Sequence, residues 1–187
     1  MRIVSGAHRG RSIVAPKGQA TRPTADRARE AVFNILAHAE FAPDLDGARV
    51  IDLFSGSGAL GLEALSRGAA FCLFVETDAA ARGAIGENLE TLGLFGAARV
   101  HRRDATALGA RPAADGPPFD LAFLDPPYAR GLGEKALASL LDGNWLTDDA
   151  LAVFERGAEE PAISLPGFEI VDERPYGAAQ VLFLKRI

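Results

Sequence analysis

The sequence has very little cysteine and no long apolar run. A single cysteine among 187 residues, Cys72, excludes an internal disulfide, and no cysteine–histidine cluster has the spacing of metal ligands. The longest apolar run, residues 68–75, is far too short to cross a bilayer. Charges begin at Arg2, too early for the apolar region of a signal peptide. We therefore expect a cytoplasmic protein with neither a metal site nor a membrane segment.

The rest of the composition is ordinary, but the charge is unevenly distributed. The chain is 48% hydrophobic and 24% charged, and its length suits one compact domain. Residues 1–30 carry seven basic and two acidic side chains, whereas the remaining residues carry 13 basic and 23 acidic ones. A basic segment on an acidic body is typical of an arm that binds nucleic acid, and a solvated charged terminus is the alternative.

The pattern of apolar residues divides the chain into an extension and an α/β part. Residues 2–15 predict a hairpin, and TRPT then predicts a helix with Thr24 as its N-cap. From residue 48 onward, short apolar runs alternate with helical stretches, which indicates a parallel sheet covered on both faces. The last two strand-like runs have no helix between them and predict an antiparallel hairpin at one edge. We expect residues 1–47 to pack as an extension on a domain of residues 48–187, in one compact unit.

The first chemical motif is a glycine loop after a strand. VIDLF runs into SGSGALG, which places Gly56, Gly58 and Gly61 in the pattern G-x-G-x-x-G. Glycines there let the chain turn tightly and let a dinucleotide or S-adenosylmethionine approach the backbone; a plain turn is the third possibility. Asp52 would repel the pyrophosphate of a dinucleotide but attract the ammonium and sulfonium groups of S-adenosylmethionine. The charge of Asp52 therefore favours S-adenosylmethionine.

Two more acidic residues follow the next two predicted strands. Glu76 could accept hydrogen bonds from both ribose hydroxyls of the cofactor. Asp104 could bind the adenine amine, or it could simply cap a turn. Because ligands of open α/β sheets bind at the carboxyl ends of the strands, we expect both residues to face one crevice together with Asp52.

The second chemical motif follows the strand FDLAFLD and reads Asp125, Pro126, Pro127, Tyr128. The prolines fix the backbone and remove two N–H donors, so the loop is rich in acceptors. The Asp125 carboxylate and the Pro126 carbonyl can hold the two hydrogens of an exocyclic amine while Tyr128 stacks on the base. Held in this way, the amine directs its lone pair at the methyl group of the cofactor. A rigid proline turn with a surface tyrosine is the alternative.

These motifs lie within longer recognisable strings. The chain reads RIVSG-x-x-RGR and TRPT-x-DR-x-REAVFNIL near its start, and then VIDLFSGSGALGLEALSRGA, FVETD and FDLAFLDPPY. With these strings it closely resembles, over essentially its whole length, the RsmD-type 16S ribosomal RNA (guanine-N(2)-)-methyltransferases. The resemblance implies methylation of the exocyclic N2 amine of a guanine in 16S ribosomal RNA of the small subunit. It also implies the class I methyltransferase fold, a Rossmann-like α/β sheet of seven mostly parallel strands with the last one antiparallel.

The resemblance also implies roles for individual residues. Residues 125–128 match the catalytic loop of the family. The expected cofactor contacts run along three segments, with the methionine part at Asp52, Phe54, Gly56 and Gly58, the ribose at Glu76, and the adenine at Asp104 and Ala105.

The basic N-terminal segment is the expected site of RNA contact. Arg9 and Arg11 flank a glycine of the predicted hairpin turn, and Lys17 continues the basic path. Arg22 either extends that path or, with Thr24 at the start of the helix, holds the carboxylate of the cofactor. We expect a monomer that acts on ribosomal RNA or on an assembling small ribosomal subunit.

Other functions fit the sequence less well. A DNA amino-methyltransferase usually needs a target-recognition domain, for which this chain has no room. An RNA-binding protein with the same fold but no activity is a further alternative, although the complete second motif argues against it. A nicotinamide-dependent oxidoreductase conflicts with the position of Asp52, and methylation of another RNA base stays open.

Overall fold

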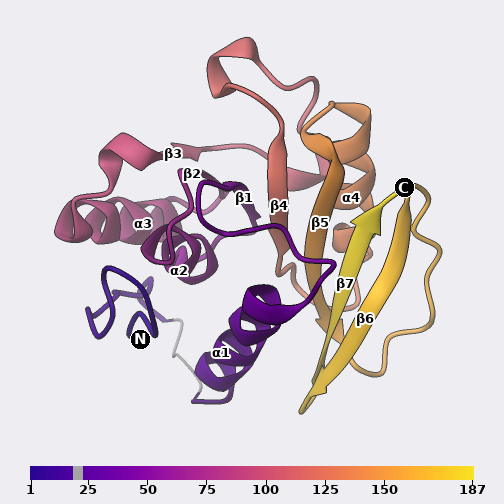
Figure 1. The fold of residues 1–187 in the computed structure, drawn as a ribbon, viewed down its shortest axis with the longest axis horizontal. Coiled ribbons are helices and arrows are strands. Elements are labelled where there is room, and N and C mark those ends of the chain that lie inside the picture. The colour runs from indigo at the N-terminus through magenta and orange to yellow at the C-terminus, as the bar shows by residue number, and fades with distance from the viewer. Residues whose placement is uncertain (19–22) are drawn as a thin grey trace.

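The computed structural model describes residues 1–18 and 23–187, and the strands of these residues form one seven-stranded sheet (Figure 1). Its order is β3-β2-β1-β4-β5-β7-β6. The first five strands run parallel, whereas β7 lies antiparallel between β5 and β6. This confirms the mostly parallel sheet with a reversed last strand. The strands are β1 (Arg49–Leu53), β2 (Phe71–Val75), β3 (Ala98–His101), β4 (Phe119–Leu124), β5 (Leu146–Gly157), β6 (Phe168–Tyr176) and β7 (Ala179–Arg186).

Helices cover both faces of the sheet. One apolar cluster joins α1, α2 and α3 to alternate strand residues such as Val50, and a second joins α4 to the opposite residues, such as Ile51. Burial on both faces explains why the strand sequences are continuously apolar. The helices are α1 (Pro23–His38), α2 (Ala59–Ser66), α3 (Ala79–Leu92) and α4 (Leu132–Asp142), with short 3₁₀ turns η1 (Phe95–Ala97), η2 (Ala105–Ala107) and η3 (Ala113–Asp115). Among the described residues, none of these helices is long and apolar enough to cross a membrane.

Helix α1 begins slightly earlier than its sequence suggests. Its first residue is Pro23, which suits that position because a first-turn residue needs no backbone N–H. Thr24 therefore lies inside the helix, and its prediction as the N-cap is wrong. Arg22 lies outside the described residues. The buried face of α1 includes Val32 and Leu36, so the helix shares a core with the sheet.

The N-terminal hairpin is present, but its pairing is short. One antiparallel bridge joins Arg2 to Ser12, and the amide of Gly10 donates to the carbonyl of Ile3 at 2.8 Å. Ile3 and Ile13 are buried and belong to the core cluster on the α1 side of the sheet. Between these residues, the amides of Val4, Ser5, Ala7 and His8 donate to Glu63 and Ser66 of α2, so regular strand pairing does not extend further.

Candidate active site

A cavity of about 870 Å³ opens at the carboxyl ends of the parallel strands. Arg29 of α1 also lines it, so the extension forms part of its wall. The structure brings together there most of the site residues predicted from the sequence, namely Asp52, Phe54, Gly56, Glu76, Asp104, Ala105, Asp125, Pro126, Pro127 and Tyr128. Gly58 lies behind this lining.

The glycine loop after β1 turns tightly and leaves its backbone open to a ligand in the cavity. Phe54 and Gly56 both have φ of +56°, and Gly58 has φ of +80°, a left-handed conformation that favours glycine. A Cβ at Gly61 would lie 2.4 Å from the ring of Phe74 and 2.6 Å from the Cys72 sulfur. Gly61 therefore lets α2 pack against β2, Gly58 forms the turn into α2, and Gly56 faces the cavity.

Asp52 is a buried carboxylate on the floor of the cavity. It is only 1% exposed, and its Oδ2 accepts one hydrogen bond, from the Gly61 amide at 3.1 Å. Burial raises the pKa of Asp52 well above its usual range; the charges of Asp125 and Glu76 raise the pKa further, and the Gly61 bond opposes both. A carboxylate held among other acids is stabilised by a cation, so this site fits a positively charged ligand group.

Glu76 and Asp104 are oriented by backbone amides. Glu76 accepts from the Gly56 amide at 2.8 Å and from the Asp78 amide at 2.9 Å, so it ties β2 to the glycine loop. Asp104 Oδ1 accepts from both the hydroxyl and the amide of Thr106, at 2.7 and 2.8 Å, and these bonds lower the pKa of Asp104. Asp104 therefore caps η2, which confirms the capping alternative, and it also lines the cavity.

The second motif leaves β4 beside the end of β5. Leu124 pairs with Phe154, so Asp125, the first residue after β4, lies beside Glu155, which is still within β5. Asp125 keeps an exposed surface toward the cavity, yet burial by the surrounding protein, together with the Glu155 charge, raises its pKa to about 7. The site thus contains a carboxyl group that titrates near neutral pH.

Tyr128 is fixed in place although 43% of it is exposed. Its hydroxyl donates to Glu155 Oε1 at 2.5 Å, and burial together with this bond raises the pKa of Tyr128. The next residue, Ala129, has φ of +59°, and its amide donates to Glu160 at 3.1 Å. The ring therefore stands at the mouth of the cavity with its hydroxyl already bound.

Two residues of this site were not assigned from the sequence. Glu155 belongs to no recognisable motif; its place at the end of an apolar run indicated only that it could line the crevice, and the strand register places it there. Arg29 is 5% exposed, donates to the Arg2 carbonyl at 2.8 Å, and pairs with Asp26 at 3.1 Å. Helical spacing could have indicated its burial, because Arg29 precedes Val32 and Leu36 on the same face of α1.

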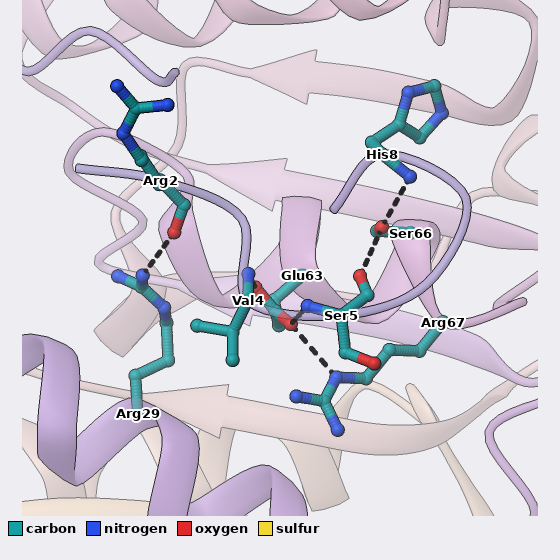
Figure 2. Close-up of polar contacts among 8 residues, drawn as sticks. All are labelled: Arg2, Val4, Ser5, His8, Arg29, Glu63, Ser66 and Arg67. Carbon is teal, nitrogen blue, oxygen red and sulfur yellow. Dashed lines mark hydrogen bonds and ion pairs between the residues drawn. The ribbon is translucent and has the colours of Figure 1, made fainter. Parts of the chain in front are cut away.

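The basic hairpin is anchored to α2 through Glu63 (Figure 2). This side chain is fully buried, and its two carboxylate oxygens accept from the amides of Val4 and Ser5 at 2.9 and 3.0 Å. Arg67 pairs with the same carboxylate at 2.9 Å. Figure 2 shows Glu63 between the hairpin backbone and Arg67, with Arg29 holding the first residues from the other side.

Further contacts join the hairpin to α2, α3 and the glycine loop. A Cβ at Gly6 would lie 1.8 Å from the Ser66 carbonyl oxygen, so only glycine fits there. Buried Asn88 exchanges two hydrogen bonds with the backbone of Val14, at 2.8 and 3.0 Å, and donates to the Ser57 carbonyl at 3.1 Å. Asn88 thereby connects the hairpin to the loop that lines the cavity.

The predicted RNA-binding residues lie on the exposed side of this hairpin. Arg9, Arg11 and Lys17 are exposed, and Arg11 also donates to the Thr91 carbonyl at 3.0 Å. Beside them, a groove of about 690 Å³ separates the hairpin from α1 and is lined by both basic and acidic side chains. Within residues 1–18 and 23–187, no group of three or more acidic, histidine or cysteine side chains could hold a metal ion.

Comparisons with known proteins agree with this geometry. The family model described as "Conserved hypothetical protein 95" matches residues 1–185. Ribosomal RNA small subunit methyltransferase D of Escherichia coli (strain K12) is 42% identical over 166 residues, covering 89% of this chain and 79% of that protein. The protein of the same name from Haemophilus influenzae is 34% identical over 178 residues, covering 95% and 89%. A solved structure of the Escherichia coli protein yhhF is 38% identical, covers 100% of this chain and 97% of that one, and superimposes with a TM-score of 0.84.

The matched family model spans nearly all of the chain, and the sheet has the predicted methyltransferase topology. This chain therefore belongs to the RsmD family, together with the ribosomal RNA small subunit methyltransferases D.

Proposed function

We propose that this protein transfers a methyl group from S-adenosylmethionine to the exocyclic N2 amine of a guanine in 16S ribosomal RNA of the small subunit. The observation that carries the proposal is the convergence of two motifs on one cavity. The acidic side chains of the glycine-loop half and the acceptor-rich loop of residues 125–128 line the same space. Membership of the RsmD family supports the choice of ribosomal RNA as the substrate.

The cofactor half of the cavity has hydrogen-bond acceptors that suit S-adenosylmethionine. When bound, this cofactor supplies an electrophilic methyl group on a cationic sulfur. Asp52 would face its ammonium group, where a buried carboxylate gains most from a cation. Phe54 and Gly56 would follow the methionine part, with Gly58 forming the turn beneath them, Glu76 would accept from the ribose, and Asp104 with Ala105 would meet the adenine. Arg22 and Thr24 are the proposed contacts of the cofactor carboxylate.

The substrate half positions the amine. The Asp125 carboxylate and the Pro126 carbonyl would each accept one of its hydrogens, Pro127 would keep the loop rigid, and Tyr128 would stack on the base. The nitrogen lone pair then points into the cavity, and such positioning supplies much of the rate of a direct displacement. The nitrogen gains the methyl carbon and loses one proton, which Asp125, with a pKa of about 7, is able to accept.

The hairpin would hold the RNA outside the cavity. Arg9, Arg11 and Lys17 are exposed cations on a segment that is otherwise firmly docked, so they can contact phosphates without unfolding the site. Ribosomal RNA or an assembling small subunit is the proposed partner, with the protein acting as a cytoplasmic monomer and without a metal.

The direct test is methyl transfer onto ribosomal subunits. Protein, radiolabelled S-adenosylmethionine and small subunits lacking the modification are incubated, and the RNA is digested to nucleosides. We expect the label in N2-methylguanosine, and about a hundredfold less label there with Asp125→Ala over the same period. Label in another nucleoside would contradict the base assignment. Calorimetry gives a separate test of the cofactor, because binding of NADH but not of S-adenosylmethionine would contradict it.

A further inference from the structure

The loop of residues 125–128 by itself does not select guanine. Adenine, cytosine and guanine each carry an exocyclic NH₂ group with two hydrogens. A carboxylate and a proline carbonyl can hold any of the three. Selection of guanine therefore requires another group near Asp125 that recognises the ring nitrogen next to the amine.

Glu155 occupies the position where such a group is needed. It follows Phe154, which pairs with Leu124, so within β5 it lies next to Asp125, the first residue after β4. Both residues line the cavity, and the Glu155 charge contributes to the raised pKa of Asp125, as expected of close neighbours. Glu155 Oε1 also accepts the Tyr128 hydroxyl at 2.5 Å, which fixes the carboxylate beside the ring proposed to stack on the base.

The bases differ at the ring nitrogen next to the amine. Guanine carries a hydrogen at N1, whereas the corresponding N1 of adenine and N3 of cytosine are acceptors. A carboxylate accepts hydrogen bonds and donates none when ionised, so it pairs with guanine and opposes the lone pair of the other two bases. A site built to hydrogen-bond one group strongly rejects analogues that lack it.

We propose that Glu155 is a specificity-determining residue, whose carboxylate accepts the N1–H of the target guanine while Asp125 and Pro126 hold the N2 amine. This assignment rests on the function proposed above. Tyr128 then serves both as the stacking surface and as the donor that orients Glu155.

The test uses a base that retains the amine but lacks the N1 hydrogen. The target guanine, once mapped, is replaced by 2-aminopurine in the small-subunit RNA, and kcat/KM is measured on both RNAs. We expect the wild type to prefer guanine by a factor of order 10 or more, as the loss of one charged hydrogen bond implies. Glu155→Gln can donate its amide N–H to the N1 acceptor of 2-aminopurine, so we expect it to reduce this preference by a similar factor. Because both RNAs are compared for each variant, a general loss of activity does not alter the ratio.

Two further variants separate the effect of the Glu155 carboxylate from other changes. Glu159→Gln makes the same chemical change at an exposed residue outside the cavity, and it should keep the wild-type preference. Tyr128→Phe removes the hydrogen bond that orients Glu155 but leaves the carboxylate, so the preference for guanine should fall less than it does in Glu155→Gln. An unchanged ratio in Glu155→Gln overturns the role of Glu155 alone. Failure of the wild type to methylate the guanine RNA overturns the proposed function, and the role of Glu155 with it.

Discussion

The cavity and the docked hairpin each contain a buried carboxylate in contact with α2, and the two differ in how their oxygens are used. Glu63, under the hairpin, accepts from two backbone amides and pairs with Arg67. Asp52, in the cavity, accepts a single amide hydrogen bond and has a strongly raised pKa. Burial is nearly complete for both. The number of partners, and not burial, therefore distinguishes a carboxylate that holds the fold together from one prepared for a cationic ligand.

The largest effect that this comparison predicts is on stability. Glu63→Ala leaves two amides and Arg67 without their shared partner, so we expect a loss of about 3–5 kcal/mol in the free energy of unfolding. Urea denaturation measures the loss, with Glu87→Ala, an exposed change on α3, as the control. A loss below about 1 kcal/mol would show that the hairpin docks without Glu63, and the contrast with Asp52 would fail.

The next effect is on catalysis. Asp125→Ala removes the group that orients the amine, and Asp125 is not one of the proposed cofactor contacts. We expect turnover to fall by a factor of order 10² or more, the usual scale of a lost positioning effect, with the dissociation constant of S-adenosylmethionine nearly unchanged. Single-turnover kinetics and calorimetry measure the two quantities. Wild-type turnover in this variant would remove the basis for assigning the loop of residues 125–128 to the chemistry.

A smaller effect concerns the pH dependence of stability. Because the folded state raises the pKa of Asp125 from 3.8 to about 7, its contribution to stability is complete below pH 3.8 and is lost as the pH rises to about 7. Because Asp125 is exposed to the cavity, solvent screening reduces this contribution to about 1 kcal/mol. Asp125→Asn should therefore melt higher than the wild type above pH 7, by roughly 2–4 °C. The advantage should shrink toward pH 4.

Thermal melts between pH 4 and 8 measure this difference. Asp142→Asn, an exposed change at the end of α4, is the control and should follow the wild type throughout. A constant difference across the pH range would mean that Asp125 does not titrate in this window.

The smallest expected effect is on salt dependence. If Arg9 and Arg11 bind phosphates of single-stranded RNA, replacing both by alanine should reduce the slope of log affinity against log salt. The reduction should be about 0.7 for each phosphate that the variant no longer neutralises. RNA affinity is measured across a salt series, with Arg174→Ala on β6, at the opposite edge of the sheet, as the control. Equal slopes for the double variant and the wild type would identify the basic hairpin as a solvated surface.

Much of the fold was predictable because it follows from local patterns. Apolar runs and glycine turns predicted the parallel sheet and the reversed last strand. They also placed Asp52, Glu76, Asp104 and Asp125 at one edge, because parallel strands end on the same side.

Other features depend on contacts between distant segments, which local patterns do not encode. Glu155 becomes part of the site only through the register of β4 and β5. Glu63 looks like an ordinary helix residue until the hairpin covers it, and its amide partners lie 58 and 59 positions away. The short pairing of the hairpin has the same cause, because α2 competes for its backbone.

The side-chain amide of Asn88 links the hairpin and the glycine loop thermodynamically. It bonds Val14 in the hairpin segment and Ser57 in the glycine loop, so opening of either segment breaks part of one shared network. Once one segment has opened, the amide is exposed to water and the second opens at lower cost. Ordering of one segment therefore favours order in the other. Such coupling is reciprocal, so if RNA holds the hairpin as proposed, it would strengthen cofactor binding by the same factor by which the cofactor would strengthen RNA binding.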